Sequence, residues 1–377
     1  MTDWVLPRYG RDTLADLLGS VAAHLGVPGH TWPAVDLPSA RRYVVLLVDG
    51  LGHQLLARHL GDVDHLSELF GTAQRLTAGV PSTTATSLTC LGTGCAPGRH
   101  GVAGYAFRSP ESGGVMNALT WEGGPEDVAG FQPVETVFEQ AAAAGVAVTS
   151  VAPARFEASG LTRAALRGPD FVAMLDESDL ALRIMETVRA SRRGERSLVY
   201  VYERALDHAG HGKGVGSDRW LEVLRRVDLF TKLLREELDD DVVLLVTGDH
   251  GMVDIAQDRM IMVEDEPGLL NGVDLFAGEG RLRQLYTSSA DQVARRWRSR
   301  LGERAWVVSR EEAVDAGWFG PLDERVADRF GDVLVAMRTD WAVMTRALPR
   351  ELTLVGQHGS LTEAEMAVPL LVDAGAP

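Results

Sequence analysis

Short apolar runs alternate with amphipathic segments along most of the chain. The continuous apolar runs are typical of strands buried on both faces of a parallel sheet. They are YVVLLV (43–48), AVTSVA (147–152), SLVYVY (197–202) and DVVLLVT (241–247). Segments with helical periodicity lie between or after them, at 133–143, 177–191 and 217–238. This alternation predicts βαβ units, and therefore an α/β fold with helices on both faces of a parallel sheet.

Residues 274–342 have a different pattern. An extended, Gly-punctuated stretch (DLFAGEGRLRQLYT) precedes a basic helical segment (SADQVARRWRSRLGE). A strand (AWVVS), a short helix (REEAVDAGW) and another strand (DVLVAM) follow. We predict a small inserted α+β subdomain at 274–342 that caps the site, and a catalytic core formed by 1–273 and 343–377. Arg281, Arg283 and Tyr286 of the insertion are candidates for substrate contact.

Composition narrows the classes of partner. The 377 residues carry a net charge of −16, with 45% hydrophobic and 24% charged residues, as in a globular protein with a sizeable core. An acidic surface argues against a nucleic-acid polymer or an anionic membrane as partner. The N-terminal stretch resembles neither a signal peptide nor a membrane helix, and Cys90 and Cys95 are expected to be reduced thiols. We expect a cytoplasmic protein that acts on a small molecule; a homodimer is compatible with this expectation.

Candidate metal ligands follow the predicted strands. Ligands of open α/β sheets bind beyond the carboxyl ends of the strands. Acidic and histidine residues in glycine-marked contexts occur at these places and in a late G-x-H-G segment: Asp49, Asp207, His211, Asp249, His250 and His358. Imidazole and carboxylate ligands suit zinc, although the same set accepts Mn²⁺ or another divalent ion. His208 is expected to point away from the metal, because Asp207 and His211 share one helix face.

The segment VPSTTATSLTCLGTGCAPGRHG (80–101) contains two kinds of nucleophile. Cys95 begins a C-x-P-x-R pattern, which marks the modified cysteine of sulfatases. Thr83, Thr84 and Thr86 offer alcohols, which become effective nucleophiles when a cation lowers their pKa. The residues of this segment alone leave both alternatives open.

The motifs as a set resemble the alkaline phosphatase superfamily. They are VDG, a Thr-rich segment ending in T-G-x-x-P-x-x-H-G, D-x-x-G-H, D-H-G-M and G-x-H-G, spread over residues 43–373. The branch they resemble is the nucleotide pyrophosphatase/type I phosphodiesterase family. The resemblance implies a three-layer sandwich with a mostly parallel central sheet. It also implies two Zn²⁺ ions, one held by Asp207, His211 and His358 and the other by Asp49, Asp249 and His250.

The same resemblance assigns the nucleophile. The modified cysteine of sulfatases lies nine residues before a Thr-Gly pair, and counting back from Thr93-Gly94 gives Thr84, whereas Cys95 follows that pair. Thr84 is therefore the implied nucleophile, acting through a phospho-threonine in the hydrolysis of phosphodiester or pyrophosphate bonds. The substrate would be a small phosphate ester or a nucleotide-like molecule.

The chain departs from the family pattern beside the nucleophile. Ala85 and Ser87 stand near the positions where relatives have a base-stacking aromatic residue and an Asn that holds a phosphate oxygen. Ser87 retains a hydrogen-bond donor, and Tyr105 is a candidate replacement ring. These departures keep a phosphomonoesterase or a phosphonate hydrolase as the alternative, while a sulfatase or a non-catalytic metal-binding protein is disfavoured. Arg204 is expected at the solvated surface or in a local ion pair with Glu203.

Overall fold

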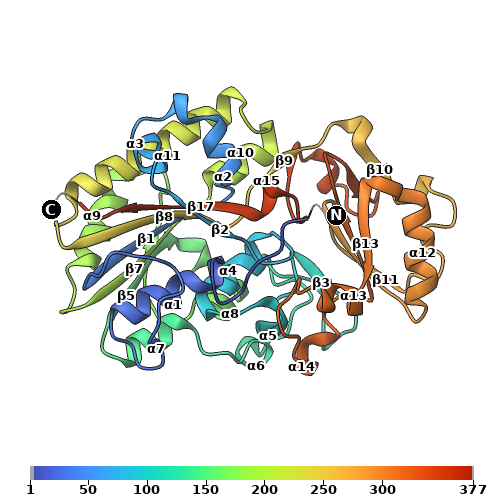
Figure 1. Ribbon diagram of the computed structural model, residues 1–377, viewed down its shortest axis with the longest axis horizontal. Helices are drawn as coiled ribbons and strands as arrows, with labels where there is room; N and C mark the ends of the chain where they lie inside the picture. The colour runs from blue at the N-terminus through green and yellow to red at the C-terminus, as the bar shows by residue number, and fades with distance from the viewer. Residues whose placement is uncertain (1–3, 376–377) are drawn as a thin grey trace.

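A seven-stranded sheet forms the centre of the computed structural model, which describes residues 4–375 (Figure 1). Its order is β2-β17-β8-β1-β7-β5-β6. The five strands from β8 to β6 run parallel, and β17 is antiparallel to both of its neighbours. The bounds are β1 Arg42–Val48, β2 Gln74–Thr77, β5 Ala147–Pro153, β6 Asp170–Met174, β7 Ser197–Glu203, β8 Val242–Gly248 and β17 Ala367–Asp373. The predicted α/β fold with a mostly parallel sheet is confirmed.

Helices cover both faces of this sheet, as the alternation of the sequence predicted (Figure 1). One face carries α1 (Leu14–His24), α4 (Thr84–Thr93), α7 (Val137–Ala143) and α8 (Gly160–Ala165). The other carries α2 (His53–Arg58), α3 (His65–Phe70), α9 (Leu180–Ser191), α10 (Ala205–Lys213) and α11 (Asp218–Glu237). Strand β1 contributes alternate residues to the two cores, Val45 to the first and Val44 to the second. A continuous apolar run is needed because both faces are buried.

Three predicted helices begin later than their apolar periodicity suggested, because polar residues cap them. The side chain of Thr136 accepts a hydrogen bond from Glu139 N–H before α7. Before α9 the side chain of Asp179 accepts from Leu182 N–H, and before α11 the side chain of Ser217 accepts from Trp220 N–H. A side-chain oxygen at this position satisfies an N–H group that has no partner within the helix.

The region 274–342 contains a four-stranded antiparallel sheet of order β11-β12-β14-β13. Its elements are β11 Leu275–Glu279, β12 Leu282–Tyr286, α12 Ala290–Leu301, β13 Ala305–Ser309, α13 Arg310–Asp315, α14 Glu324–Ala327 and β14 Val333–Met337. Helix α12 packs on one face through Trp297, whereas Trp306 and Leu334 of the other face join the core of the main sheet. The division into core and cap stays a prediction, and its outer limits at residues 1 and 377 lie outside the described residues.

Shorter elements connect these parts. They are α5 Pro97–His100, α6 Val128–Phe131, α15 Glu363–Met366, β3 Ala106–Arg108, β4 Val115–Asn117, β9 Val253–Asp254, β10 Met260–Met262, β15 Ala342–Met344 and β16 Gly356–Gln357. Single 3₁₀ turns occupy η1 Leu60–Asp62, η2 Ala154–Phe156, η3 Gln257–Arg259, η4 Val263–Asp265, η5 Gly302–Arg304 and η6 Glu351–Thr353. Within residues 4–375, no helix combines the length and apolar composition that crossing a membrane requires.

Candidate active site

The carboxyl ends of β1 and β8 and the start of α10 meet at one place. Asp49 follows β1, and its N–H donates to the carbonyl of Glu203 at the end of β7 (2.8 Å). Asp207 in the first turn of α10 donates its N–H to the carbonyl of Asp49 (3.1 Å). Gly50 has φ of +76°, and an added Cβ would lie 3.0 Å from the Cα of Asp207. Glycine is therefore required for the close approach of β1 and α10.

The six predicted ligands form two groups of three. Asp207, His211 and His358 form one group; Asp49, Asp249 and His250 form the other. Within each group, one donor atom per residue lies within 4.8 Å of the other two. These are the two sets that the family resemblance implied.

All three histidines are oriented by their second ring nitrogen. Nδ1 of His211 lies 2.7 Å from the carbonyl of Gly356, Nδ1 of His250 lies 2.9 Å from that of Gly251, and Nδ1 of His358 lies 3.0 Å from that of Ser82. A carbonyl oxygen only accepts, so each Nδ1 carries a proton, and in the neutral ring Nε2 then holds the lone pair that a metal ion requires. Metal-ligating histidines are held in this way in proteins.

The buried carboxylates of the site favour the binding of cations. Burial, together with the charge of Asp49, raises the pKa of both Asp207 and Asp249 well above the usual range. Burial lowers the pKa of His250, but the carboxylates of Asp249 and Asp49 outweigh that effect and raise it to about 10. Oδ1 of Asp207 and Oδ2 of Asp249 are buried without a hydrogen-bond partner. Buried carboxylates of this kind are stable when paired or bound to a metal, so the donor set fits metal ions.

Thr84 lies against this cluster. It is the first residue of α4 and is buried, with its Oγ1 3.2 Å from Nε2 of His250 and 3.4 Å from Oδ1 of Asp49. The other hydroxyls of the segment have different surroundings: Thr83 is the residue before α4, and Thr86 donates to the carbonyl of Val102 (3.3 Å). Of the three, Thr84 is the one whose hydroxyl contacts candidate metal ligands.

Cys95 lies at the opposite end of α4. Its thiol donates to the carbonyl of Thr93 (3.4 Å), and burial raises its pKa, so that the thiolate is disfavoured. His100, in the turn that follows, is fully buried and accepts a hydrogen bond at Nδ1 from the N–H of Val102 (3.1 Å). His100 and the exposed His208 belong to neither ligand group. The C-x-P-x-R pattern therefore has no metal cluster beside it among the described residues.

A cavity of about 370 Å³ opens beside Thr84 and the ligands. Tyr105 lines it, and its contact with substrate stays a prediction. Ala85 and Ser87 do not: both are fully buried, and Ala85 packs in the core beneath the sheet. They follow Thr84 on faces of α4 that turn away from the cavity. From the insertion, Glu279 and Gly280 reach the cavity wall.

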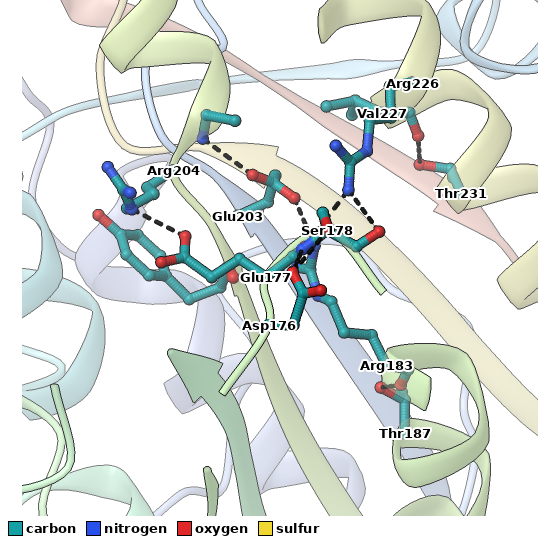
Figure 2. A network of polar contacts seen from close by, with 12 residues as sticks. Asp176, Glu177, Ser178, Arg183, Thr187, Glu203, Arg204, Arg226, Val227 and Thr231 are labelled. Carbon is teal, nitrogen blue, oxygen red and sulfur yellow. Dashed lines mark hydrogen bonds and ion pairs between the residues drawn. The ribbon is translucent and has the colours of Figure 1, made fainter. Parts of the chain in front are cut away.

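The ion pair between Glu203 and Arg204, one of the two alternatives considered for Arg204, does not form (Figure 2). Glu203 pairs instead with Arg183 of α9, with 2.5 Å between Oε2 and Nη1, and both side chains are buried. Arg204 donates through Nε to Oε2 of Glu177 (2.8 Å) and lines the cavity. Neighbours in sequence point to opposite sides where a strand ends, so each finds a distant partner.

The three candidates for substrate contact in the insertion do not line the cavity. Arg281 and Arg283 are fully buried and form ion pairs with Glu365 and Glu351. Tyr286 is buried and donates to the carbonyl of Arg329 (2.6 Å). These polar side chains join the four-stranded sheet to neighbouring segments, a role that their sequence pattern did not reveal.

Tyr202 is a site residue that sequence reasoning missed. Its hydroxyl donates to Oδ2 of Asp49, on the far side of the carboxylate from Thr84 and His250. In the sequence it is hidden in the apolar run of β7. The available signal was the tyrosine hydroxyl itself, which needs a partner when it is buried.

Comparisons with known proteins place this geometry in a family. The type I phosphodiesterase / nucleotide pyrophosphatase family matches the chain over residues 43–361. No individual curated protein matches the sequence significantly. Murine ectonucleotide pyrophosphatase / phosphodiesterase 5 superposes with a TM-score of 0.69 and 18% identity over 89% of this chain and 88% of that chain. An inactive variant of it, in complex with AMP, gives 0.68 and 17% over 88% and 87%.

A second solved structure shares the fold. Phosphonoacetate hydrolase from Sinorhizobium meliloti 1021, in complex with phosphonoformate, superposes with a TM-score of 0.67 and 18% identity. The match covers 91% of this chain and 92% of that chain. At these identities the structural likenesses establish the fold, and the family match establishes the relationship. The chain belongs to the type I phosphodiesterase / nucleotide pyrophosphatase family, a family of metal-dependent hydrolytic enzymes in the alkaline phosphatase superfamily.

Proposed function

We propose that the protein hydrolyses phosphodiester or pyrophosphate bonds of a small molecule, with Thr84 as nucleophile and two Zn²⁺ ions as cofactors. The observation that carries this proposal is the position of the Thr84 hydroxyl, within 3.4 Å of a ligand atom from both Asp49 and His250. An alcohol in that position shares its surroundings with the candidate metal ligands. Such placement is how a poor nucleophile is activated near neutral pH.

Each ligand group offers three nitrogen or oxygen donors, which is the number that catalytic zinc sites take from the protein. One ion would be held by Asp207, His211 and His358, and the other by Asp49, Asp249 and His250. Mn²⁺ or another divalent ion is compatible with the same donors. Bound metal supplies positive charge that lowers the pKa of the alcohol and stabilises the attacking and leaving oxygens.

The remaining chemistry belongs to side chains and backbone of the chain. Oγ1 of Thr84 forms a bond to phosphorus while the bond to the ester oxygen breaks, and the released alcohol leaves with the proton that Thr84 loses. Water then attacks the phospho-threonine and restores the hydroxyl. The first N–H groups of α4, which begins at Thr84, favour the phosphoryl charge.

A phosphomonoesterase or phosphonate hydrolase is the second candidate function. The observation that favours it is Arg204, which reaches the cavity and is held there by Glu177. A guanidinium beside the phosphoryl group would offset the additional charge of a monoester or phosphonate. The fold shared with a phosphonoacetate hydrolase is consistent with this alternative.

Rates on three nitrophenyl esters test the proposal. The zinc-loaded protein is assayed with a phosphodiester, a phosphomonoester and a sulfate, next to Thr84→Ala, Thr84→Ser and Cys95→Ala. We expect a preference for the diester, loss of turnover in Thr84→Ala, partial retention in Thr84→Ser, and no change in Cys95→Ala. A preference for the monoester would support the second candidate. Sulfate turnover that survives Thr84→Ala and is lost in Cys95→Ala would contradict both.

A further inference from the structure

The cavity beside Thr84 has two chemically different sides. One side carries Arg204 and Glu279 together with four of the six predicted ligands, which are Asp49, Asp207, His211 and His358. The opposite wall is contributed by residues between 150 and 171, and none of the described residues in that stretch that line the cavity is charged. Its apolar members are Ala152, Phe156, Leu161, Leu166 and Phe171. A phosphoryl group placed at Thr84 would therefore lie between a charged side and an apolar side.

The strand register creates the floor of the apolar side. Phe171 of β6 pairs with Ser150 of β5, and Ser150 pairs with Tyr200 of β7. Residues paired directly across parallel strands project to the same face, so the three side chains form one row across the sheet. All three line the cavity. The next residue of β6, Val172, projects to the opposite face and packs in the other core.

Helices close the apolar side. Leu88 lies one turn after Thr84, so it projects from the same face of α4 into the cavity. Leu161 of α8 and Leu166 just beyond its end line the cavity from another side. The volume of about 370 Å³ is within the range of small-molecule sites, and it adjoins the reactive hydroxyl directly.

The apolar side is unsuited to a second phosphate. A charged group placed against Leu161, Leu166 and Phe171 would lose its hydration without gaining a partner, at a large free-energy cost. The polar side chains on this side are neutral hydroxyls: those of Ser150 and Tyr200 on the floor, and those of Ser159 and Thr162 on the wall. The Tyr200 hydroxyl is buried with no hydrogen-bond partner, and Ser159 and Thr162 bind each other. An occupant that is apolar along its length, with at most a neutral polar atom at its far end, fits this wall.

We infer that the cavity binds an apolar alkyl or aryl group that is attached to the phosphoryl centre of the substrate. This inference rests on the proposed function for the position of the phosphorus. It deepens that function by naming the substrate class: phosphate esters of apolar alcohols or phenols, in preference to nucleotides.

Binding of alkylphosphonates tests the inference without turnover. Methyl-, butyl- and hexylphosphonate carry one carbon substituent each, so the substituent must enter the cavity when the phosphonate lies at the metals. We expect calorimetry on zinc-loaded Thr84→Ala protein to show affinity rising about threefold to fourfold per added methylene until the cavity is filled. The use of Thr84→Ala makes the result independent of whether Thr84 is the nucleophile.

Phe171→Gln should flatten the increase along the series, because it places an amide in the apolar floor. Val172→Gln is the matched control: it is the adjacent residue of the same edge strand on the other face, and it should leave the increase unchanged. Leu161→Gln provides a second test from α8, with thermal unfolding used to verify that each variant is folded. Equal affinity for all three phosphonates, no binding of any, or tighter binding of adenosine monophosphate than of hexylphosphonate would overturn the inference.

Discussion

Asp49 uses nearly every polar atom it has. Its N–H binds the end of β7, its carbonyl binds the start of α10, and Oδ2 accepts from Tyr202. Oδ1 is left beside His250 and Thr84. One oxygen of the carboxylate is thus held by a residue outside the ligand groups, Tyr202, before any metal binds. Removal of a residue that orients a metal ligand typically lowers metal affinity by about 10- to 100-fold.

We therefore expect Tyr202→Phe to weaken metal binding by about 10- to 100-fold while the protein stays folded. Competition with a chromogenic chelator measures the affinity. Tyr200→Phe is the matched control, because that ring lies next to Tyr202 on the same strand but its hydroxyl has no bond to Asp49. Equal affinities of the two variants would contradict a positioning role for Tyr202.

His100 gives the protein a pH-dependent stability that is separate from the metal site. Burial, with a contribution from Arg329, lowers the pKa of His100 to about 3. In the unfolded chain the pKa returns to about 6.5, so below that pH the unfolded state binds a proton that the folded state does not. Stability present above pH 6.5 is lost as pH falls toward 3, by about 1.4 kcal/mol per pH unit.

His100→Asn should remove this dependence, since its amide oxygen can accept from Val102 N–H without titrating. Urea unfolding of chelator-treated protein between pH 7 and 4.5 measures the effect. The free energy of unfolding of the unmodified protein should fall more steeply with acidity than that of the variant. Parallel curves for the two proteins would refute the assignment.

At the scale of elements, α4 determines where Thr84, the proposed nucleophile, lies. Helix α4 begins at Thr84 and packs on α8, and a Cβ added at Gly92 would lie 1.8 Å from the carbonyl oxygen of Ala165. Because the contact is with backbone, a side chain at Gly92 would fit only if α4 or α8 moved. Because α8 also forms part of the cavity wall, the contact at Gly92 affects both the position of Thr84 and the shape of the pocket.

Gly92→Ala should lower the free energy of unfolding by about 1–3 kcal/mol, through overpacking, and reduce turnover. Gly212→Ala in α10 is the control, since no atom lies within 4 Å of its added Cβ, and it should be neutral or stabilising. Denaturant unfolding and the diester assay provide the two readouts. If Gly92→Ala has the same free energy of unfolding as Gly212→Ala, α4 and α8 can move apart at little cost and the prediction is wrong.

Sequence pattern predicted the elements better than it predicted which way side chains face. The apolar runs predicted the parallel strands, and the glycine-marked contexts pointed to the residues that the fold gathers into two candidate ligand groups, because both are local signals. The inaccessibility of Ala85 and Ser87 depends on how α4 rotates against the sheet, which is a property of packing. Likewise, Arg281 is charged in sequence yet fully buried, because its partner lies 84 residues away. Long-range pairs of this kind leave no local pattern.

At the scale of the whole molecule, the four-stranded sheet is anchored to the chain's last segment. Arg281, in the turn just before β12, binds both carboxylate oxygens of Glu365 in α15, through Nε at 3.0 Å and Nη2 at 2.7 Å. Neither side chain is exposed. Glu365 also accepts from Ser360 N–H, close to the candidate ligand His358. This ion pair therefore connects the expected cap with the segment that contains His358.

Arg281→Met should cost about 3–5 kcal/mol of unfolding free energy, because it leaves the Glu365 carboxylate buried without a counter-charge. Combining it with Glu365→Gln should restore part of the loss, since the amide removes the uncompensated charge. Urea unfolding of both variants measures the difference. If Arg281→Met alone has a free energy of unfolding within about 1 kcal/mol of that of the parent protein, the prediction is wrong. Water would then reach Glu365, and the ion pair would contribute little to stability.

The stereochemical course at phosphorus tests the central claim most directly. A phosphorothioate diester of known configuration is hydrolysed in ¹⁸O-labelled water by the zinc-loaded protein, and the configuration of the product is determined. Attack by Thr84 followed by attack of water inverts phosphorus twice, so the account predicts net retention. Net inversion would mean that water attacks the substrate directly, and Thr84 would then not be the nucleophile.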